Sequence, residues 1–197
     1  IRGQKEDYDN WSNLISSNKG EWSYKDVLEY FKKMENNPID DDFHGKKGPL
    51  SVSNVPTPHP ITKAFIEGAV SQGIPYNGDV NGEKQEGVGP NQGTIMDGRR
   101  NNSSSAFLGR AKSRKNLTII KNALVDKIIF KNKKAVAVKY ELNSKIEEAH
   151  CYGEIIISSG TLSSPAILMR SGIGPSNHLK DLNIEIIEES PSVGDNL

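Results

Sequence analysis

The stretch EIIISSGTLSSPAILMRSGIGP, from Glu154 to Pro175, combines an apolar run, a corner of small residues and a second apolar segment. The run Ile155–Ile157 does not alternate between apolar and polar residues, which is typical of a strand buried on both faces of a parallel sheet. The chain then turns through Ser158, Ser159 and Gly160 and continues into a segment that stops at Gly172 and Gly174. The stretch therefore predicts strand, corner and helix, which is an α/β arrangement.

The predicted helix after the corner offers a place for an anion. Ser163 or Ser164 suits the N-cap, and Pro165 suits the first helical position. Unpaired N–H groups at a helix start favour a phosphate, and small residues let a ligand approach the backbone. Ligands of open α/β sheets lie outside the carboxyl ends of the strands, where this corner falls. Because a corner of this kind also occurs without a ligand, a purely structural role stays open at this point.

The first half of the chain predicts two helices separated by turns. EWSYKDVLEYFKKMENNP (21–38) reads as a helix capped by Ser23, with Asp26 three residues on. ITKAFIEGAVSQG (61–73) reads as a second helix, with Ile61, Phe65 and Ala69 on one face and Gly73 as its stop. PLSVSNV (49–55) is a candidate short strand, and residues 74–105 predict a long loop in which GVGPNQG (87–93) is a plain turn.

From Asn116 to Gly160 the sequence is β-rich. Residues 131–134 and 143–145 mark hairpin turns, and AVAVKYEL (135–142) alternates between two faces. The pattern predicts an antiparallel meander that leads into the buried strand at 154–157.

Bulk composition limits the class of protein. The 197 residues carry a formal net charge of 0, which gives no reason to expect nucleic acid or an anionic membrane as a partner, and the basic run GRAKSRKN (109–116) is interpreted as a solvated loop. Cys151, the only cysteine, excludes an intrachain disulfide and a cysteine-based metal site, and we expect an inert buried thiol. No apolar run is long enough to cross a bilayer. Sequons at Asn10, Asn101, Asn102 and Asn116 favour a secreted protein, although an Asn- and Ser-rich chain also makes them by chance.

Several motifs together resemble one family of flavoenzymes. GTLSSPAILMRSGIG resembles the second signature of the glucose–methanol–choline (GMC) oxidoreductases, which are FAD-dependent enzymes acting on alcohols. RGQKEDYDNW, EWSYKDVLEYFKKMEN, HGKKGPLSVS, NLTII and SVGDNL follow the order of the family's own segments. Asp-Gly-x-Arg (97–100), Ala-Phe-Leu (106–108) and Val-Gly-Asp-Asn-Leu (193–197) are similar to the insect glucose-dehydrogenase-like subgroup.

The resemblance implies a mixed α/β fold: part of an FAD-binding α/β domain with an antiparallel meander, and part of a substrate domain built on an antiparallel sheet. We expect residues 1–21 to form a lid or linker and residues 22–113 to belong to the substrate domain. Residues 114–174 would belong to the FAD-binding domain, and residues 175–197 would lead back toward the substrate domain. The residues that match the family's cofactor contacts are Val125, through its backbone at the adenine, and Ser159 and Gly160 along the ADP part.

The resemblance also implies a reaction, in which the carbon of an alcohol gives hydride to the flavin and oxygen or a quinone accepts the electrons. A family member that binds flavin without redox turnover, or a lyase, is the alternative. The chain shows neither the family's GxGxxG unit nor its catalytic histidine region, so we expect an internal fragment that is inactive alone. His44, His59, His150 and His178 match no catalytic position, no metal is expected, and the alcohol stays open. Asn101, Asn102 and Arg170 depart from residues common in relatives.

Overall fold

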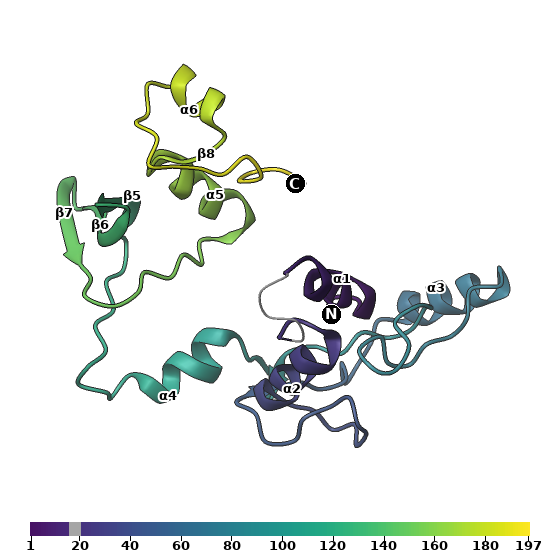
Figure 1. Cartoon of the computed structure of the whole chain (residues 1–197). Coiled ribbons are helices and arrows are strands. Elements are labelled where there is room, and N and C mark those ends of the chain that lie inside the picture. Colours follow the sequence, from purple (N-terminus) through teal and green to yellow (C-terminus); the bar gives the residue numbers. More distant parts are fainter. Residues whose placement is uncertain (16–20) are drawn as a thin grey trace. The chain divides into compact units, whose positions relative to one another are not determined.

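The computed structural model describes residues 1–15 and 21–197, and divides the chain into two compact units (Figure 1). The first unit comprises residues 1–117 and the second residues 118–197. Small sheets and short helices make up both, which confirms the predicted mixed α/β class. The assignment of segments to a substrate domain and an FAD-binding domain stays a prediction, and residues 16–20 of the predicted lid lie outside the described residues.

The first unit consists of short elements joined by long loops. Its elements are α1 (Lys5–Leu14), α2 (Tyr24–Met34), β1 (Glu35–Asn36), β2 (Leu50–Ser51), α3 (Pro60–Ser71), β3 (Ile95–Met96), β4 (Arg99–Arg100), the π-helix η1 (Ser104–Leu108) and α4 (Gly109–Ala111). The parallel pair β1–β2 and the antiparallel pair β3–β4 are its sheets. The predicted strand at 49–55 is therefore present but short. Residues 87–93, predicted as a plain turn, form no helix but contain two bridge residues, Val88 opposite Tyr76 and Gly93 opposite Ser53.

The two predicted helices of this unit are confirmed. The Ser23 hydroxyl caps α2 by accepting the N–H of Asp26, and aromatic rings join α2 to α1, with Tyr8 6.1 Å from Phe31. His59 caps α3 and Gly73 follows its end with φ +90°. The predicted apolar face of α3 is not covered by described residues, because the Phe65 side chain is 71% exposed.

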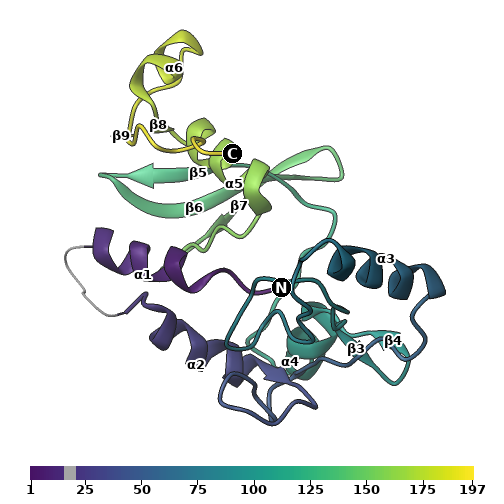
Figure 2. The same cartoon turned by 90° about the vertical axis from the view of Figure 1, so that its right-hand side faces the viewer.

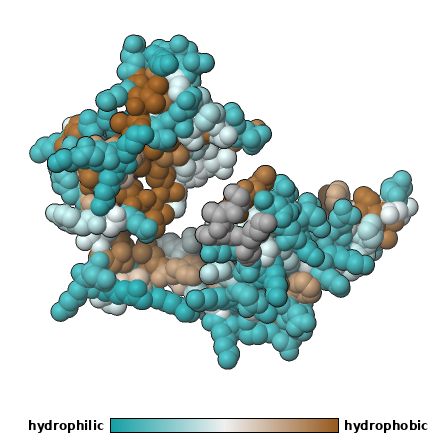
Figure 3. All heavy atoms as spheres, viewed as in Figure 1, coloured by the Kyte–Doolittle hydropathy of each residue, from teal (hydrophilic) through white to brown (hydrophobic). Residues whose placement is uncertain are grey.

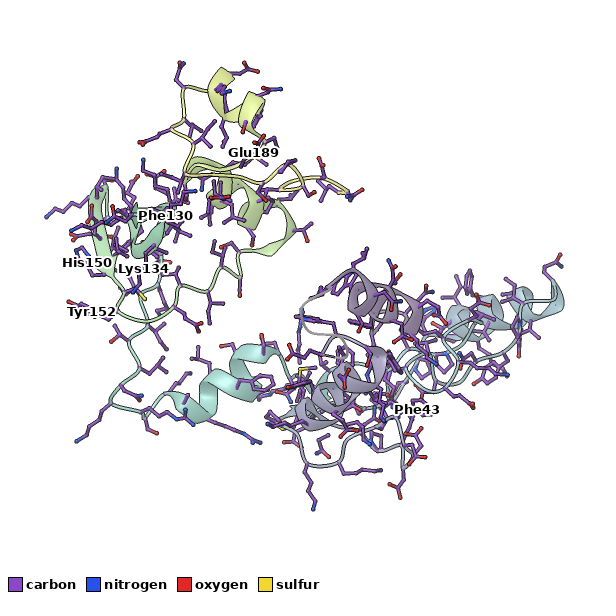
Figure 4. All side chains as sticks on the ribbon, in the orientation of Figure 1. Phe43, Phe130, Lys134, His150, Tyr152 and Glu189 are labelled. Carbon is purple, nitrogen blue, oxygen red and sulfur yellow. The ribbon has the colours of Figure 1, made fainter. Side chains whose placement is uncertain are left out.

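The second unit is built on the predicted meander (Figure 2). Strands β5 (Leu124–Lys131), β6 (Lys134–Leu142) and β7 (Lys145–His150) pair antiparallel in chain order. Both hairpins have two central residues with positive φ, Asn132–Lys133 and Asn143–Ser144, which matches the right-handed twist of paired strands. The Tyr152 side chain lies beyond β7 and points into solvent (Figure 4).

Helix α5 (Gly160–Arg170) packs on β5 and forms the core of this unit with the sheet. The buried side chains are Ile128, Ala137, Ile167 and Leu179, the last of which lies in α6 (Ser176–Asp181). The Ser171 hydroxyl is buried between the helix and the sheet. It accepts the Ile128 N–H at 2.8 Å and donates to the Ile167 carbonyl at 2.6 Å.

Two short parallel strands, β8 (Ile173–Gly174) and β9 (Glu188–Glu189), close the second unit. The Lys133 ammonium, at the first hairpin, donates to the Glu188 carboxylate at 2.8 Å and holds the pKa of that carboxyl below its ordinary value. No helix in the described part of the chain is both long and apolar enough to span a membrane.

Four local predictions differ from the structure. Residues 118–121 form no strand, so the β-rich segment begins at Leu124. Residues 154–157 pair with no described strand, and Ile156 is 82% exposed because nothing described covers it. The helix begins at Gly160, so Pro165 lies inside it and neither Ser163 nor Ser164 is the N-cap. Cys151 is half-buried, and its thiol donates to the Glu154 carbonyl.

We predict that Ser171→Ala lowers the free energy of unfolding by about 1–3 kcal/mol, because the buried Ile128 N–H loses its acceptor. The control is Ser192→Ala, which changes an exposed serine of the same unit. Urea unfolding of the two variants measures the difference in their free energies of unfolding. Equal unfolding midpoints for the two variants would contradict the bridging role of Ser171.

Candidate functional site

The predicted corner exists, at the point where an extended segment enters α5. Ser159 is the N-cap residue of the helix, and its N–H donates to the Ser164 hydroxyl at 3.1 Å. Gly160 has φ +88°, a left-handed conformation that glycine adopts without strain. Apart from its chain neighbours and the backbone of α5, no heavy atom of the described residues lies within 4 Å of the place where a Cβ at Gly160 would be, so the space beside the backbone is open. The corner is exposed and leaves room for a ligand.

The start of α5 is suited to an anion. The helix has 11 residues, and the N–H groups of a first turn have no partner within the helix. The helix dipole adds a partial positive charge at this end. The described first turn contains no acidic residue that would oppose an anion.

Val125, on β5, lies beside the C-terminal end of α5. It is half-buried near the start of β5, where its carbonyl accepts an N–H of the Arg170 guanidinium at 3.3 Å, and Arg170 also donates to the Asp126 carbonyl at 2.7 Å. Arg170 is the last residue of α5, and a helix of this length spans about 16 Å. The structure thus places Val125, Ser159 and Gly160 in one unit but at opposite ends of α5, so a ligand that touches all three has to be extended.

A second group of polar residues, which sequence reasoning missed, is buried in the first unit. One Glu35 carboxylate oxygen accepts from the Arg2 guanidinium at 2.5 Å and from the Gly45 N–H at 3.0 Å, and it lies 2.9 Å from Nδ1 of His44. The other ring nitrogen of His44 lies 2.8 Å from the Asp79 carboxylate. We call Arg2, Glu35, His44 and Asp79 the buried charge network.

Each side chain of this network has a hydrogen-bond partner within it. A carboxylate only accepts hydrogen bonds, so Nε2 of His44 carries a hydrogen toward Asp79. Nδ1 lies between the Glu35 carboxylate and the Asn37 amide nitrogen, which is 3.0 Å away. The Glu35 carboxylate is buried together with the Arg2 guanidinium that it pairs with, which is the condition under which a buried charge is tolerated.

The network ties distant segments of the first unit together. Arg2 also donates to the Phe43 carbonyl, and Gln85 donates to the Arg2 carbonyl at 2.7 Å. Gly45 sits so close to α2 that a Cβ there would lie 1.7 Å from the Lys32 carbonyl oxygen. The motif HGKKGP around His44 was the one sequence signal for this network. Arg2, Glu35 and Asp79 could not be linked to His44 from the sequence, because they lie in other segments of the chain and follow no regular spacing.

The described residues contain one group that could hold a metal ion. Ligand atoms of Asp41, His44 and Asp79 lie within 4.8 Å of one another. Nε2 of His44 already forms a hydrogen bond with the Asp79 carboxylate, so a metal ion could bind these ligands only by replacing that hydrogen bond.

The other histidines lie outside any cluster of reactive groups. His59 caps α3, while His150 on β7 and His178 on α6 are exposed.

A cleft of about 1280 Å³ in the first unit is lined by residues of α1, the start of α2 and the loop 75–86, including Tyr24 and Tyr76. Two smaller clefts, of about 640 and 590 Å³, adjoin Asp41 and the β3–β4 hairpin.

Comparison with known proteins shows the family to which this mixed α/β chain belongs. The family model described as GMC oxidoreductase matches residues 1–197, so the chain belongs to the GMC oxidoreductase family. An oxygen-dependent choline dehydrogenase from Burkholderia ambifaria is 42% identical over 202 residues, which cover 100% of this chain and 35% of that protein.

Solved structures show the same family relationship. Pyridoxine 4-oxidase from Mesorbium loti is 31% identical, with a TM-score of 0.87 over 98% of this chain and 38% of its own. An FAD-dependent oxidoreductase from Chaetomium thermophilum is 30% identical, with a TM-score of 0.86 over 98% of this chain and 35% of its own. The chain thus spans about a third of the length of the relatives it matches. The cofactor of the protein is FAD, and the open corner at Gly160 fits an extended, anionic group of this kind.

We predict that Glu35→Ala lowers the free energy of unfolding by about 3–5 kcal/mol, because it leaves the Arg2 guanidinium buried without its ion-pair partner and removes an acceptor of the Gly45 N–H. Asp40→Ala is the matched control, since it removes an exposed ion pair with Lys46 and is expected to change stability by about 1 kcal/mol or less. Denaturant unfolding of both variants gives the comparison, and similar losses in the two would refute a special role for Glu35.

Proposed function

We propose that the full-length protein is an FAD-dependent oxidoreductase that acts on the CH–OH group of an alcohol. The observation that carries the proposal is the corner at Ser159–Gly160, open and at the start of α5, in a chain that matches the family along all of its residues. When bound, the flavin would accept a hydride from the alcohol carbon. Turnover would need groups beyond this chain, which alone is expected to be inactive.

In this proposal three residues contact the cofactor. Ser159 and Gly160 line the ADP part, where the first turn of α5 presents N–H groups to the phosphates. Val125 contacts the adenine through its backbone at the other end of the helix. Its carbonyl already accepts one hydrogen bond from Arg170, and a carbonyl oxygen has a second lone pair.

The substrate is proposed as a small alcohol. The relatives named above act on different molecules by their names, choline in one and pyridoxine in another, so they do not select one alcohol. The motifs at 97–100, 106–108 and 193–197 support an insect glucose-dehydrogenase-like member, with oxygen or a quinone as the electron acceptor. Both assignments are proposals.

A flavin-binding relative without redox turnover, or a lyase, is the second candidate. The observation in its favour is Asn101, a departure from the residue common in relatives. Its side chain is 2% exposed and its amide nitrogen has no hydrogen-bond partner among the described residues. A buried donor without an acceptor is destabilising. The Asn101 amide therefore has a cost in stability at this position that a smaller side chain without an amide group would not have.

Reduction by alcohols separates the two candidates. The full-length product of the gene is purified and scanned for the absorbance bands of oxidised flavin, and choline, glucose and pyridoxine are then added without oxygen. Bleaching by one of them is the expected result and identifies the substrate class. Bands that never bleach would support the second candidate, and a folded protein without bands would overturn both.

We predict that Gly160→Ala lowers the flavin content of the purified full-length protein. A Cβ meets no neighbour there, but the left-handed backbone costs about 1–2 kcal/mol for any residue with a side chain, so the corner shifts. Gly68→Ala is the control, because Gly68 is exposed within α3 and also has open space. Flavin absorbance per protein is the measurement, and equal content in the two variants would contradict the role of the corner.

A further inference from the structure

The charge of this chain is segregated, although its sum is zero. Residues 98–125 contain seven Lys and Arg residues and no Asp or Glu. Because the whole chain has 25 basic and 25 acidic residues, the remaining residues hold 18 basic against 25 acidic ones. Residues 98–125 therefore carry a formal charge of +7, and the rest of the chain carries −7.

Six of these basic side chains lie in the first unit, and none is neutralised there. Arg99, Arg100, Arg110, Lys112, Arg114 and Lys115 are exposed. None of the six forms an ion pair or side-chain hydrogen bond with a residue of the described ranges 1–15 and 21–197, whereas Lys32, Lys46, Lys133 and Arg170 do form ion pairs. The sequence interpretation of 109–116 as a solvated loop is wrong for residues 109–111, which form α4, and it does not explain why none of these cations pairs with a described carboxylate.

The segment that carries these residues is anchored to the unit. Asn101 is buried and its N–H donates to the Thr94 carbonyl at 2.8 Å, while Ala106 is buried and its N–H donates to the Asn102 carbonyl at 2.9 Å. The β3–β4 hairpin and the helical turns of η1 and α4 thus present the cations from an ordered backbone. The basic surface, defined as residues 98–117, is part of the folded unit.

Apolar side chains accompany the cations. Phe107 is 42% exposed and precedes the basic run, and Leu117 is 36% exposed and follows it. Figure 3 shows hydrophilic residues along the lower edge of the part that carries α4, with apolar residues beside them. Lys and Arg next to exposed Phe and Leu are the composition of segments that lie in the interface of an anionic bilayer.

The arrangement fits a surface better than a pocket-bound partner. None of the six cationic side chains lines any of the three clefts described above. The charges are spread over an exposed stretch, as in polybasic segments attracted by lipid headgroups.

We propose that the basic surface binds the headgroups of anionic lipids, so that the protein associates peripherally with a membrane. The guanidinium and ammonium groups meet the lipid phosphates, and Phe107 inserts among the acyl chains at the boundary. The attraction is electrostatic and is therefore screened by salt. This inference does not depend on the reaction proposed above.

The test uses the full-length protein and sedimentation with vesicles of phosphatidylcholine, alone or mixed with phosphatidylglycerol. We expect binding to the mixed vesicles at low salt, weaker binding to the neutral ones, and loss of the difference at high salt. The double variant Arg110→Glu/Arg114→Glu is expected to weaken binding by about tenfold or more. The double variant Lys131→Glu/Lys145→Glu, which makes the same charge change in the second unit, is expected to bind as the unchanged protein does.

Three results would overturn the proposal. The first is equal sedimentation with neutral and anionic vesicles, and the second is equal weakening by the two double variants. The third is binding of polyglutamate but not of anionic vesicles, which would assign the surface to an acidic protein instead. Thermal unfolding of each variant separates loss of binding from loss of fold, and Phe107→Ser, expected to weaken vesicle binding with the charges intact, tests the insertion.

Discussion

One carboxylate oxygen of Glu35 holds the first unit together. It meets the Arg2 guanidinium, the His44 imidazole and the Gly45 N–H, so it joins the segment of Glu35 to two others, the N-terminal segment and the loop at 44–45. The unit has few long elements and a small apolar core, of which Ala106 is the buried hydrophobic residue. Where apolar burial is limited, a polar network with every member paired fixes the path of the loops, because each broken contact leaves a buried charge without a partner.

The second unit depends on a different kind of contact. Its sheet is made by neighbouring segments, and α5 is held on it by apolar side chains and by the Ser171 hydroxyl. The same helix carries the corner at one end and Arg170 at the other, so the contact that stabilises the unit also positions the residues proposed to hold the cofactor. One helix, α5, thus serves both the packing of the second unit and the position of the corner at Ser159–Gly160.

Much of the local structure could be predicted. The cap at Ser23, the stops at Gly73 and Gly172 and both hairpins depend on residues within a few positions of one another, and all are present. The strand at 154–157 could not be predicted correctly, since an apolar run indicates burial but does not supply the neighbour to pair with. The start of α5 was misplaced because Ser163, Ser164 and Pro165 all have good capping or first-turn chemistry, while the left-handed Gly160 sets the actual boundary.

The meander, the corner of small residues and the family resemblance could all be read from the sequence, because they depend on short-range patterns and on motif order. Packing was needed to place His44 between Glu35 and Asp79, to set Val125 and Gly160 at opposite ends of α5, and to leave the cations of 98–117 without an ion pair to any described residue. Arg2 and Glu35 are 33 residues apart, and His44 and Asp79 are 35 apart. Contacts over such separations follow from the packing of the folded chain, and no local pattern in the sequence records them.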